Sequence, residues 1–180
     1  MKDIIKIATI LPYKENYTFS KAQAAAIWVC DFFKYSDYKN TNFIFGNTIG
    51  NDYLTKNYIN IKINNLKSKL SSSTNEYCQN FIEKTKDSNF DIIEIHNRPL
   101  VFNYLKNKVI AKFIIYFHND PLSMNGSRSH EERLKLLNHV DKIIFVSKWV
   151  QTRFFINLDP KLMNKTEIVY PSIHREKKIF

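Results

Sequence analysis

The stretch DIIEIHNRPLVFNYLKNKVIAKFIIYF, from Asp91 to Phe117, decides the fold. Its two ends, Asp91 to Ile95 and Ile110 to Phe117, are short apolar runs, which is typical of buried parallel strands. Pro99 to Lys106, between them, is expected to form a helix. A strand, a helix and a second strand at this spacing predict a parallel β-α-β unit with a right-handed crossover.

The same alternation continues on both sides of this unit. Further strands are predicted at Ile4 to Leu11, Asn42 to Phe45, Tyr58 to Ile63, Asp141 to Val146 and Thr166 to Tyr170. Further helices are predicted to begin at N-caps Ser20, Ser73, Ser129 and Ser147, with ends near Phe33, Lys86, Val140 and Ile156. Ser73 with Glu76, and Ser129 with Glu132, have capping-box spacing. The sequence therefore predicts an α/β, Rossmann-like domain with an open, mainly parallel sheet and helices on both faces.

The composition fits one folded domain of 180 residues. A formal net charge of +10 suits anionic partners, but the lysines are scattered and only five arginines occur, which argues against nucleic acid. Charged residues interrupt the first apolar run, and no apolar stretch approaches the roughly 20 residues needed to span a bilayer. We therefore expect a cytoplasmic protein, at most peripheral at the inner membrane face, with Cys30 and Cys78 as buried free thiols.

Glycine is informative through its scarcity, since the chain has only three. No GxGxxG follows the first predicted strand, no Walker-type loop occurs, and no GxSxG is present. These absences argue against a dinucleotide-binding dehydrogenase, a P-loop enzyme and an α/β-hydrolase.

Polar side chains follow four of the predicted strands. Ligands of open parallel sheets bind beyond the carboxyl ends of the strands. The residues expected at that edge are Pro12, Tyr13, His96, Asn97, Arg98, His118, Asn119, Asp120, Ser147 and Lys148. Four loops thus deliver polar groups to one candidate site.

His118 is the first candidate, because an imidazole can donate or accept a hydrogen bond near neutral pH and share developing charge. The alternative is a histidine that only caps a strand end, and its companions His96 and Asp120 favour a site. A metal held by His96, His118 and Asp120 is conceivable by ligand type, but substrate binding without a metal is preferred. Arg98 pairs with a phosphate or carboxylate, or begins a solvated helix, and both interpretations stay open.

Two further segments have structural alternatives. Asn119 to Pro121 can be a simple turn. The aromatic residues Trp149, Phe154 and Phe155 could lie on a membrane surface, but packing in the core is the preferred interpretation.

Three runs in order, DIIEIHNRP, IIYFHNDP and DKIIFVSKWV, resemble the N-terminal domain of family 4 glycosyltransferases of the GT-B fold. The segment LPYKENYTFSKAQAAAIWV, from Leu11 to Val29, is similar to the first loop and helix of that domain. The resemblance implies retaining transfer of a sugar from a nucleotide-diphosphate donor, without a bound metal or other cofactor. It also implies that the acceptor, a sugar or a lipid-linked glycan, lies mainly on this domain.

The resemblance also assigns residues. His118 matches the position that reaches the donor sugar and is the candidate catalytic residue, while Tyr13 to Ser20 matches the loop that closes over donor phosphates and acceptor. Gln23 stands where relatives usually have glycine at the start of the first helix. The candidate substrate-binding residues are Tyr13, Lys14, Ser20, Gln23, His96, Asn97, Arg98, Asn119, Asp120, Ser147 and Lys148.

The expected organisation is one N-terminal, acceptor-side domain over residues 1–171, followed by the start of an interdomain linker at 172–180. The donor-binding C-terminal domain would then be absent and supplied by a separate domain or subunit. The expected function is the N-terminal half of a sugar transferase for cell-surface polysaccharide or lipid glycan synthesis. The alternatives are a non-catalytic module that binds carbohydrate or anionic lipid and, with least support, a basic nucleic-acid-binding domain.

Overall fold

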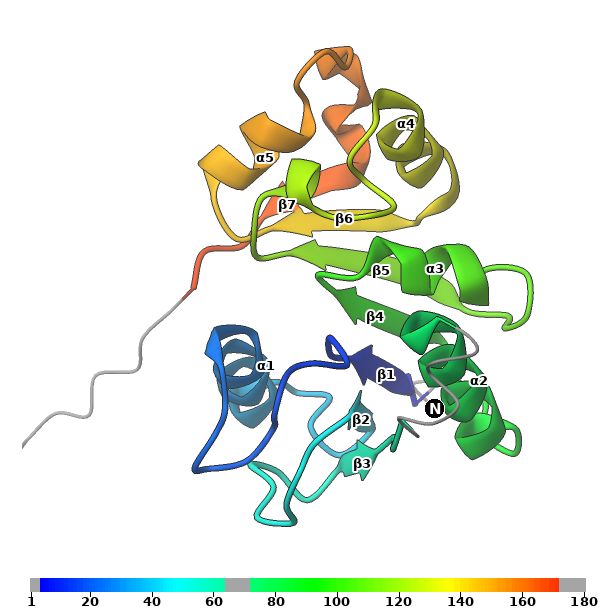
Figure 1. The fold of residues 1–180 in the computed structure, drawn as a ribbon. Helices are drawn as coiled ribbons and strands as arrows, with labels where there is room; N and C mark the ends of the chain where they lie inside the picture. The colour runs from blue at the N-terminus through cyan, green and yellow to red at the C-terminus, as the bar shows by residue number, and fades with distance from the viewer. Residues whose placement is uncertain (1–3, 64–71, 172–180) are drawn as a thin grey trace, which may run out of the picture.

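The computed structural model describes residues 4–63 and 72–171. Its centre is a parallel sheet with the strand order β3-β2-β1-β4-β5-β6-β7. The strands are β1 (Ile7–Ile10), β2 (Asn42–Gly46), β3 (Tyr58–Asn60), β4 (Ile92–His96), β5 (Lys112–Phe117), β6 (Lys142–Phe145) and β7 (Thr166–Ile168). The chain builds outward from β1 to β3 and then returns to the other side of β1 with β4 (Figure 1). The topological switch point therefore lies between β1 and β4.

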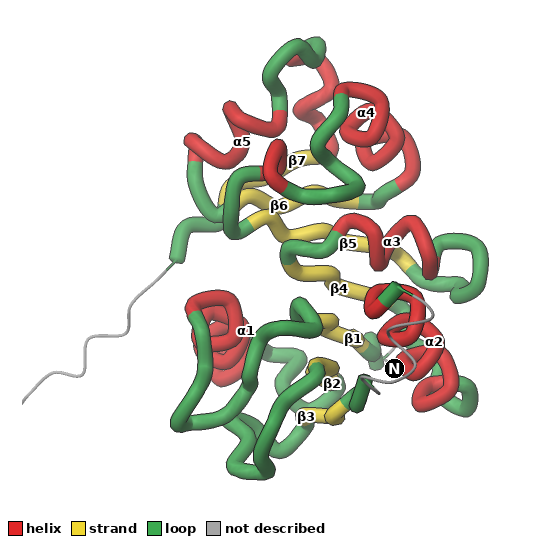
Figure 2. Tube along the Cα trace, viewed as in Figure 1, coloured by secondary structure: helices red, strands yellow, loops and turns green. Residues whose placement is uncertain are grey.

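Most of the connections between the strands contain helices, whereas the connection from β2 to β3 is a loop (Figure 2). They are α1 (Ala24–Tyr35), α2 (Ser73–Thr85), α3 (Pro99–Leu105), α4 (His130–His139), α5 (Lys148–Phe154) and the short 3₁₀ segments η2 (Pro121–Ser123) and η3 (Pro160–Lys165). The predicted α/β, Rossmann-like architecture is confirmed.

The two faces of the sheet are covered unequally. The larger core contains alternate strand residues such as Phe45 and Phe117, packed against apolar residues from α2, α3, α4 and α5. On the opposite face, Leu11 and Ile44 pack against Val29 and its neighbours on α1. Figure 1 accordingly shows α1 on one side of the strands and α2 and α3 on the other. Because side chains alternate along a strand, residues two positions apart share one of these faces.

Two predicted helix starts are wrong. The first helix begins at Ala24 with Gln23 at its N-cap, instead of at Ser20, because the amides of Lys21 and Ala22 bond to the Thr18 carbonyl in a preceding turn. The second helix is capped by Ser72, whose Oγ accepts from the Asn75 amide at 3.2 Å. The N-cap of this helix therefore lies one residue before Ser73, the predicted N-cap.

The later caps are confirmed. Ser129 Oγ accepts from the Glu132 amide at 3.1 Å, and a Glu132 carboxylate oxygen accepts from the Ser129 amide at 3.0 Å. Ser147 caps α5 by accepting from the Val150 amide at 3.2 Å. Helices α4 and α5 thus begin at the N-caps predicted from the sequence.

Burial tests the remaining structural predictions. Cys30 and Cys78 are buried free thiols, as expected. Phe154 and Phe155 are buried in the core, but Trp149 is 58% exposed, so its predicted core packing is wrong. None of the helices in residues 4–63 and 72–171 has the length and apolarity required to cross a membrane. The predicted linker at 172–180 lies outside the described residues.

Candidate functional site

Asn97 joins the loops that leave β4 and β5 at the switch point. Its backbone has a φ of 52°, in the left-handed region that asparagine tolerates better than most residues. Its Oδ1 accepts from the amide of His118 at 2.7 Å and from the amide of Asn119 at 3.3 Å. Because Asn97 is only 5% exposed, these bonds hold the two loops together from inside the protein.

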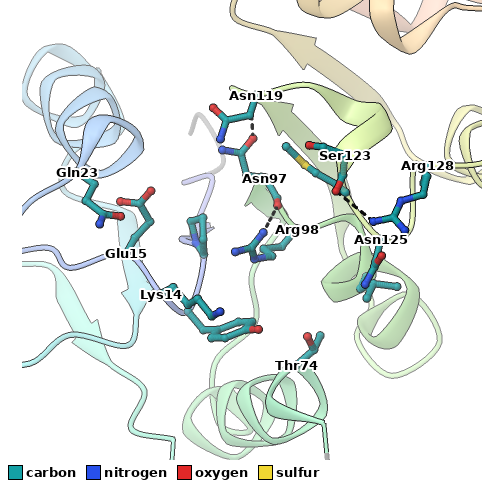
Figure 3. A pocket seen from close by; sticks show the side chains of 14 residues that line it. Lys14, Glu15, Gln23, Thr74, Asn97, Arg98, Asn119, Ser123, Asn125 and Arg128 are labelled. Atoms are coloured by element: carbon teal, nitrogen blue, oxygen red, sulfur yellow. Dashed lines mark hydrogen bonds between the residues drawn. The ribbon is translucent and has the colours of Figure 1, made fainter.

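Two cavities lie on either side of this junction. The first, about 380 Å³, is formed by the loop after β1, the starts of α2 and α3, and the segment from Ser123 to Arg128 (Figure 3). The second, about 540 Å³, lies against α1 and is lined by Ile27, Trp28, His118 and neighbouring residues. Glu15, Gln23, Asn97 and Asn119 line both. The predicted strand-end site is thus divided into two compartments.

A pair of histidines borders the second cavity. His96 Nδ1 and His118 Nε2 are 2.8 Å apart, and the His96 side chain is fully buried. The His96 ring stacks on Tyr116 at a centroid distance of 4.5 Å, and Trp28 meets the His118 ring edge-on at 5.1 Å. Burial lowers the pKa of His118 to about 4, and burial together with the neighbouring His118 lowers the pKa of His96 well below its usual value. Both rings are therefore neutral at neutral pH.

The position of the shared proton follows from hydrogen-bond satisfaction. His96 Nε2 is buried and has no hydrogen-bond partner. A proton on that nitrogen would be an orphaned buried N–H, so the neutral ring is better protonated at Nδ1, from which it donates to His118 Nε2. Neutral His118 then carries its own proton on Nδ1. No partner for that Nδ1 lies within the described ranges, and it is not among the buried unpaired atoms, so it is free to donate to a ligand.

A buried polar network lies on the same face of the sheet. Thr9 Oγ1 is 2.8 Å from Glu94 Oε2 and 3.0 Å from Asn42 Oδ1, and the Tyr116 hydroxyl is 3.3 Å from Glu94 Oε1. Burial raises the pKa of Glu94, while the bonds from Thr9 and Tyr116 oppose that change. Because Tyr116 also stacks on His96, this network packs against the histidine pair through the Tyr116 ring.

The structure brings together most of the predicted site residues. The first cavity is lined by Tyr13, Lys14, Gln23, Asn97, Arg98 and Asn119, and the second by Gln23, Asn97, His118 and Asn119. His96 does not line the second cavity but contacts two of its lining residues, His118 and Trp28.

Four other predicted residues line neither cavity. Ser20 is exposed in the turn before α1. Asp120 caps η2 and forms an ion pair with Arg153 at 2.8 Å, and the bond from Arg153 lowers the pKa of Asp120. Ser147 caps α5, and Lys148 donates to the Gln151 side chain at 2.9 Å. Asp120 is therefore engaged by Arg153 and does not join the two histidines.

Several residues at the cavities are not found by the strand-end rule, among them Glu15, Trp28 and Arg128. Glu15 lies further along the loop after β1, Trp28 is on α1, and Arg128 precedes α4. The sequence feature that could have drawn attention to two of them is their rarity. Trp28 is one of only two tryptophans, and Arg128 is one of few arginines in a lysine-rich chain.

The fold of this chain is similar to that of solved glycosyltransferases. No protein-family model matches the sequence, and no curated protein matches it at a significant level. The solved structures that are similar in fold include glycosyltransferases of the GT-B class. At 11% to 13% sequence identity, the similarity is one of fold.

Three of these structures illustrate the likeness. HepE of Anabaena, solved in complex with UDP-glucose, is 13% identical with a TM-score of 0.64, over 94% of this chain and 44% of HepE. The lipopolysaccharide outer core galactosyltransferase WaaB is 13% identical with a TM-score of 0.65, over 96% of this chain and 47% of WaaB. A sucrose-phosphate synthase structure from Thermosynechococcus elongatus is 12% identical with a TM-score of 0.55, over 92% of this chain and 88% of that one. This chain thus spans less than half of HepE and WaaB.

Proposed function

We propose that this chain is the N-terminal, acceptor-side half of a retaining sugar transferase that uses a nucleotide-diphosphate sugar in cell-surface polysaccharide or lipid glycan synthesis. The observation that carries the proposal is the position of His118, beside a cavity at the switch point, where open sheets bind their ligands. The fold shared with HepE, which was solved with UDP-glucose, supports the reaction class. A second domain or subunit would hold most of the donor nucleotide.

The proposed role of His118 follows from its charge and tautomer. When a nucleotide diphosphate leaves a sugar, positive charge develops at the anomeric carbon. A neutral imidazole does not repel that charge, whereas an imidazolium would. His118 Nδ1–H would donate to a hydroxyl of the donor sugar and orient it in the second cavity.

The test is the release of UDP from UDP-glucose and UDP-galactose, with and without candidate acceptors, by the wild-type chain and by His118→Ala, each combined with the donor-binding second domain or subunit. His139→Ala is the matched control, because His139 is exposed at the end of α4. We expect donor turnover by wild type and the control, and a loss of at least about tenfold in His118→Ala, the typical scale of a lost positioning group. No turnover of either donor by the wild-type chain together with that second domain or subunit contradicts the proposal.

The second candidate is a non-catalytic module that binds carbohydrate or anionic lipid. Gln23 favours it, because this exposed side chain lines both cavities at the N-cap of α1, where similar enzymes usually have glycine for close donor approach. This candidate predicts sugar binding without turnover, and binding that persists in His118→Ala. Titration of the two proteins with the same nucleotide-sugars separates the candidates.

A further inference from the structure

Three cationic side chains from separate loops converge on the first cavity. Lys14 follows β1, Arg98 is the N-cap residue of α3, and Arg128 lies in the loop before α4. Figure 3 shows Arg98 between Lys14 on one side and Asn125 with Arg128 on the other. Glu15 is the single carboxylate in the described lining of this cavity. With Glu15 ionised, the four groups together carry a net charge of about +2.

These cations lack the partners that occupy other arginines. Within residues 4–63 and 72–171, no ion pair involves Lys14, Arg98 or Arg128. Arg153, in contrast, pairs with Asp120, and Arg133 donates to four backbone carbonyls. Glu15 interacts electrostatically with Arg98, but this single carboxylate leaves the first cavity with an excess of positive charge.

Arg98 is the clearest of the three. One of its terminal nitrogens donates to the Asn97 carbonyl at 3.2 Å, while its Nε is buried without a partner. Its guanidinium lies 5.5 Å from the centre of the Tyr13 ring. Within the described residues, its other terminal nitrogen has no hydrogen bond and is not among the buried unpaired atoms, so it can donate to an oxyanion placed in this cavity.

The opposite wall is also prepared for an oxyanion. Arg128 is exposed and makes one long contact, 3.5 Å, to the Ser123 carbonyl, which leaves most of its donors free. The side chains of Ser123, Asn125 and Thr74 add neutral hydrogen-bonding groups to the lining. Gly126 holds this wall close to α3, since it has a φ of 92° and a side chain there would lie 3.0 Å from the Leu100 amide nitrogen.

We propose that the first cavity binds the phosphate group of a phosphomonoester, with Arg98 and Arg128 as the principal ligands and Lys14 as a further cation. The inference rests on the proposed function for its role, since the phosphate would belong to the acceptor while the donor sugar occupies the neighbouring cavity. A dianion matches the charge of the lining better than a single carboxylate does. The volume of about 380 Å³ leaves room for part of the attached sugar or glycerol unit.

The phosphomonoester could come from a soluble phosphorylated sugar or from a lipid headgroup, and two assays distinguish these sources. Glycerol 3-phosphate is titrated into the full chain by calorimetry, with glycerol as the neutral comparison. Co-sedimentation is measured with phosphatidylcholine vesicles, with and without one-fifth phosphatidic acid. Binding of glycerol 3-phosphate alone supports a soluble acceptor, and additional selective binding to phosphatidic acid vesicles supports a lipid headgroup.

The variants are Arg98→Gln, Arg128→Gln and Lys14→Gln, with Lys161→Gln as the matched control because Lys161 is an exposed lysine far along the chain in η3. We expect at least about a tenfold loss of phosphate affinity in Arg98→Gln, a smaller loss in the other two, and no change in the control. Arg128 is exposed, so its variant tests the site even if Arg98→Gln folds poorly.

Two results would overturn the inference: no phosphate-dependent binding by wild type in either assay, or equal binding by Arg128→Gln and Lys161→Gln. Neither assay uses a nucleotide-sugar, so its result is independent of transferase activity. Phosphate binding without sugar transfer would leave this site standing and remove the proposed function. Sugar transfer that is unaffected by Arg98→Gln and Arg128→Gln would support the proposed function and remove the proposed phosphate site.

Discussion

The two cavities at the switch point share one wall and differ in chemistry. The first is lined by Lys14, Arg98 and Arg128, whereas the second has an aromatic and aliphatic lining around the neutral His118. Strand geometry explains the position of His118 in the second cavity. His118 lies two residues after Tyr116, so it points to the face of the sheet that α1 covers. Arg98 instead leaves β4 toward α3. One sheet edge can therefore present a cavity with three cationic side chains beside a mainly apolar one whose described lining contains carboxylates, Glu15 and Asp31, but no lysine or arginine.

The largest effect on stability is expected from replacement of Asn97, which lies in the wall that the two cavities share. Asn97→Ala deletes the acceptor for two loop amides and places alanine at a φ of 52°, so we expect a loss of about 2 to 4 kcal/mol in the free energy of unfolding. Both cavities should lose ligand affinity together. Urea unfolding measures the stability, and Asn97→Asp, which keeps the acceptor oxygen, should be much closer to wild type. If the alanine and aspartate variants were equally stable, Asn97 would not join the loops as described.

Acidification should affect the second cavity in particular. The pKa of His118 is lowered from 6.5 to about 4 by burial, so the unfolded chain binds a proton in this range that the folded chain does not. The stability contributed by neutral His118 is present above about pH 6.5 and falls as the pH drops toward 4, by up to about 3 kcal/mol. Glu94 acts in the opposite direction, because its raised pKa makes the folded state hold a proton as the pH rises through its range.

The comparison with His118→Gln reports on the coupled pair of His118 and His96, since Glu94 is present in both proteins and the pKa of His96 depends in part on His118. Urea unfolding between pH 4 and 6.5 should show a steeper rise of stability with pH for wild type than for the variant. Equal slopes would show that His118 is not held neutral by the fold.

The first cavity can be perturbed alone at Gly126. A methyl group there would meet the Leu100 amide nitrogen at 3.0 Å, and the φ of 92° disfavours any side chain, so Gly126→Ala should destabilise the fold by about 1 to 2 kcal/mol. We expect weaker phosphate binding and unchanged titration of His118 by NMR. Gly50→Ala is the control, because Gly50 has a similar φ of 109° but lines neither cavity. Loss of phosphate affinity in both variants would point to general destabilisation.

A structural feature can be predicted from the sequence when the interactions that form it join residues close together in the chain. The alternating strands and helices, and the caps at Ser129 and Ser147, depend on neighbouring residues and were predicted correctly. The start of α1 was not, because the turn that displaces it depends on the bridge between Thr18 and Tyr53. A local pattern carries no information about such a distant partner.

The site shows the same division. The strand-end rule locates His96 and His118 but not the 2.8 Å contact between them, which requires β4 and β5 to be neighbours in register. It also includes Asp120, whose partner Arg153 comes from α5, and it misses Trp28, which α1 brings in from the opposite side of the switch point. Partners from other elements decide which polar residue at a strand end faces a ligand.

The smallest perturbation gives the sharpest comparison of the cavities. Trp149 is 58% exposed, so Trp149→Phe should change the stability by less than about 0.5 kcal/mol and leave Trp28 as the only tryptophan. Because Trp28 lines the second cavity and contacts His118, its fluorescence should change on titration with UDP-glucose and remain constant with glycerol 3-phosphate. A response to glycerol 3-phosphate alone would place the phosphate beside α1 and reverse the assignment of the two cavities. A response to both ligands would mean that the shared wall at Asn97 transmits binding from one cavity to the other, which the double variant with Asn97→Ala would test.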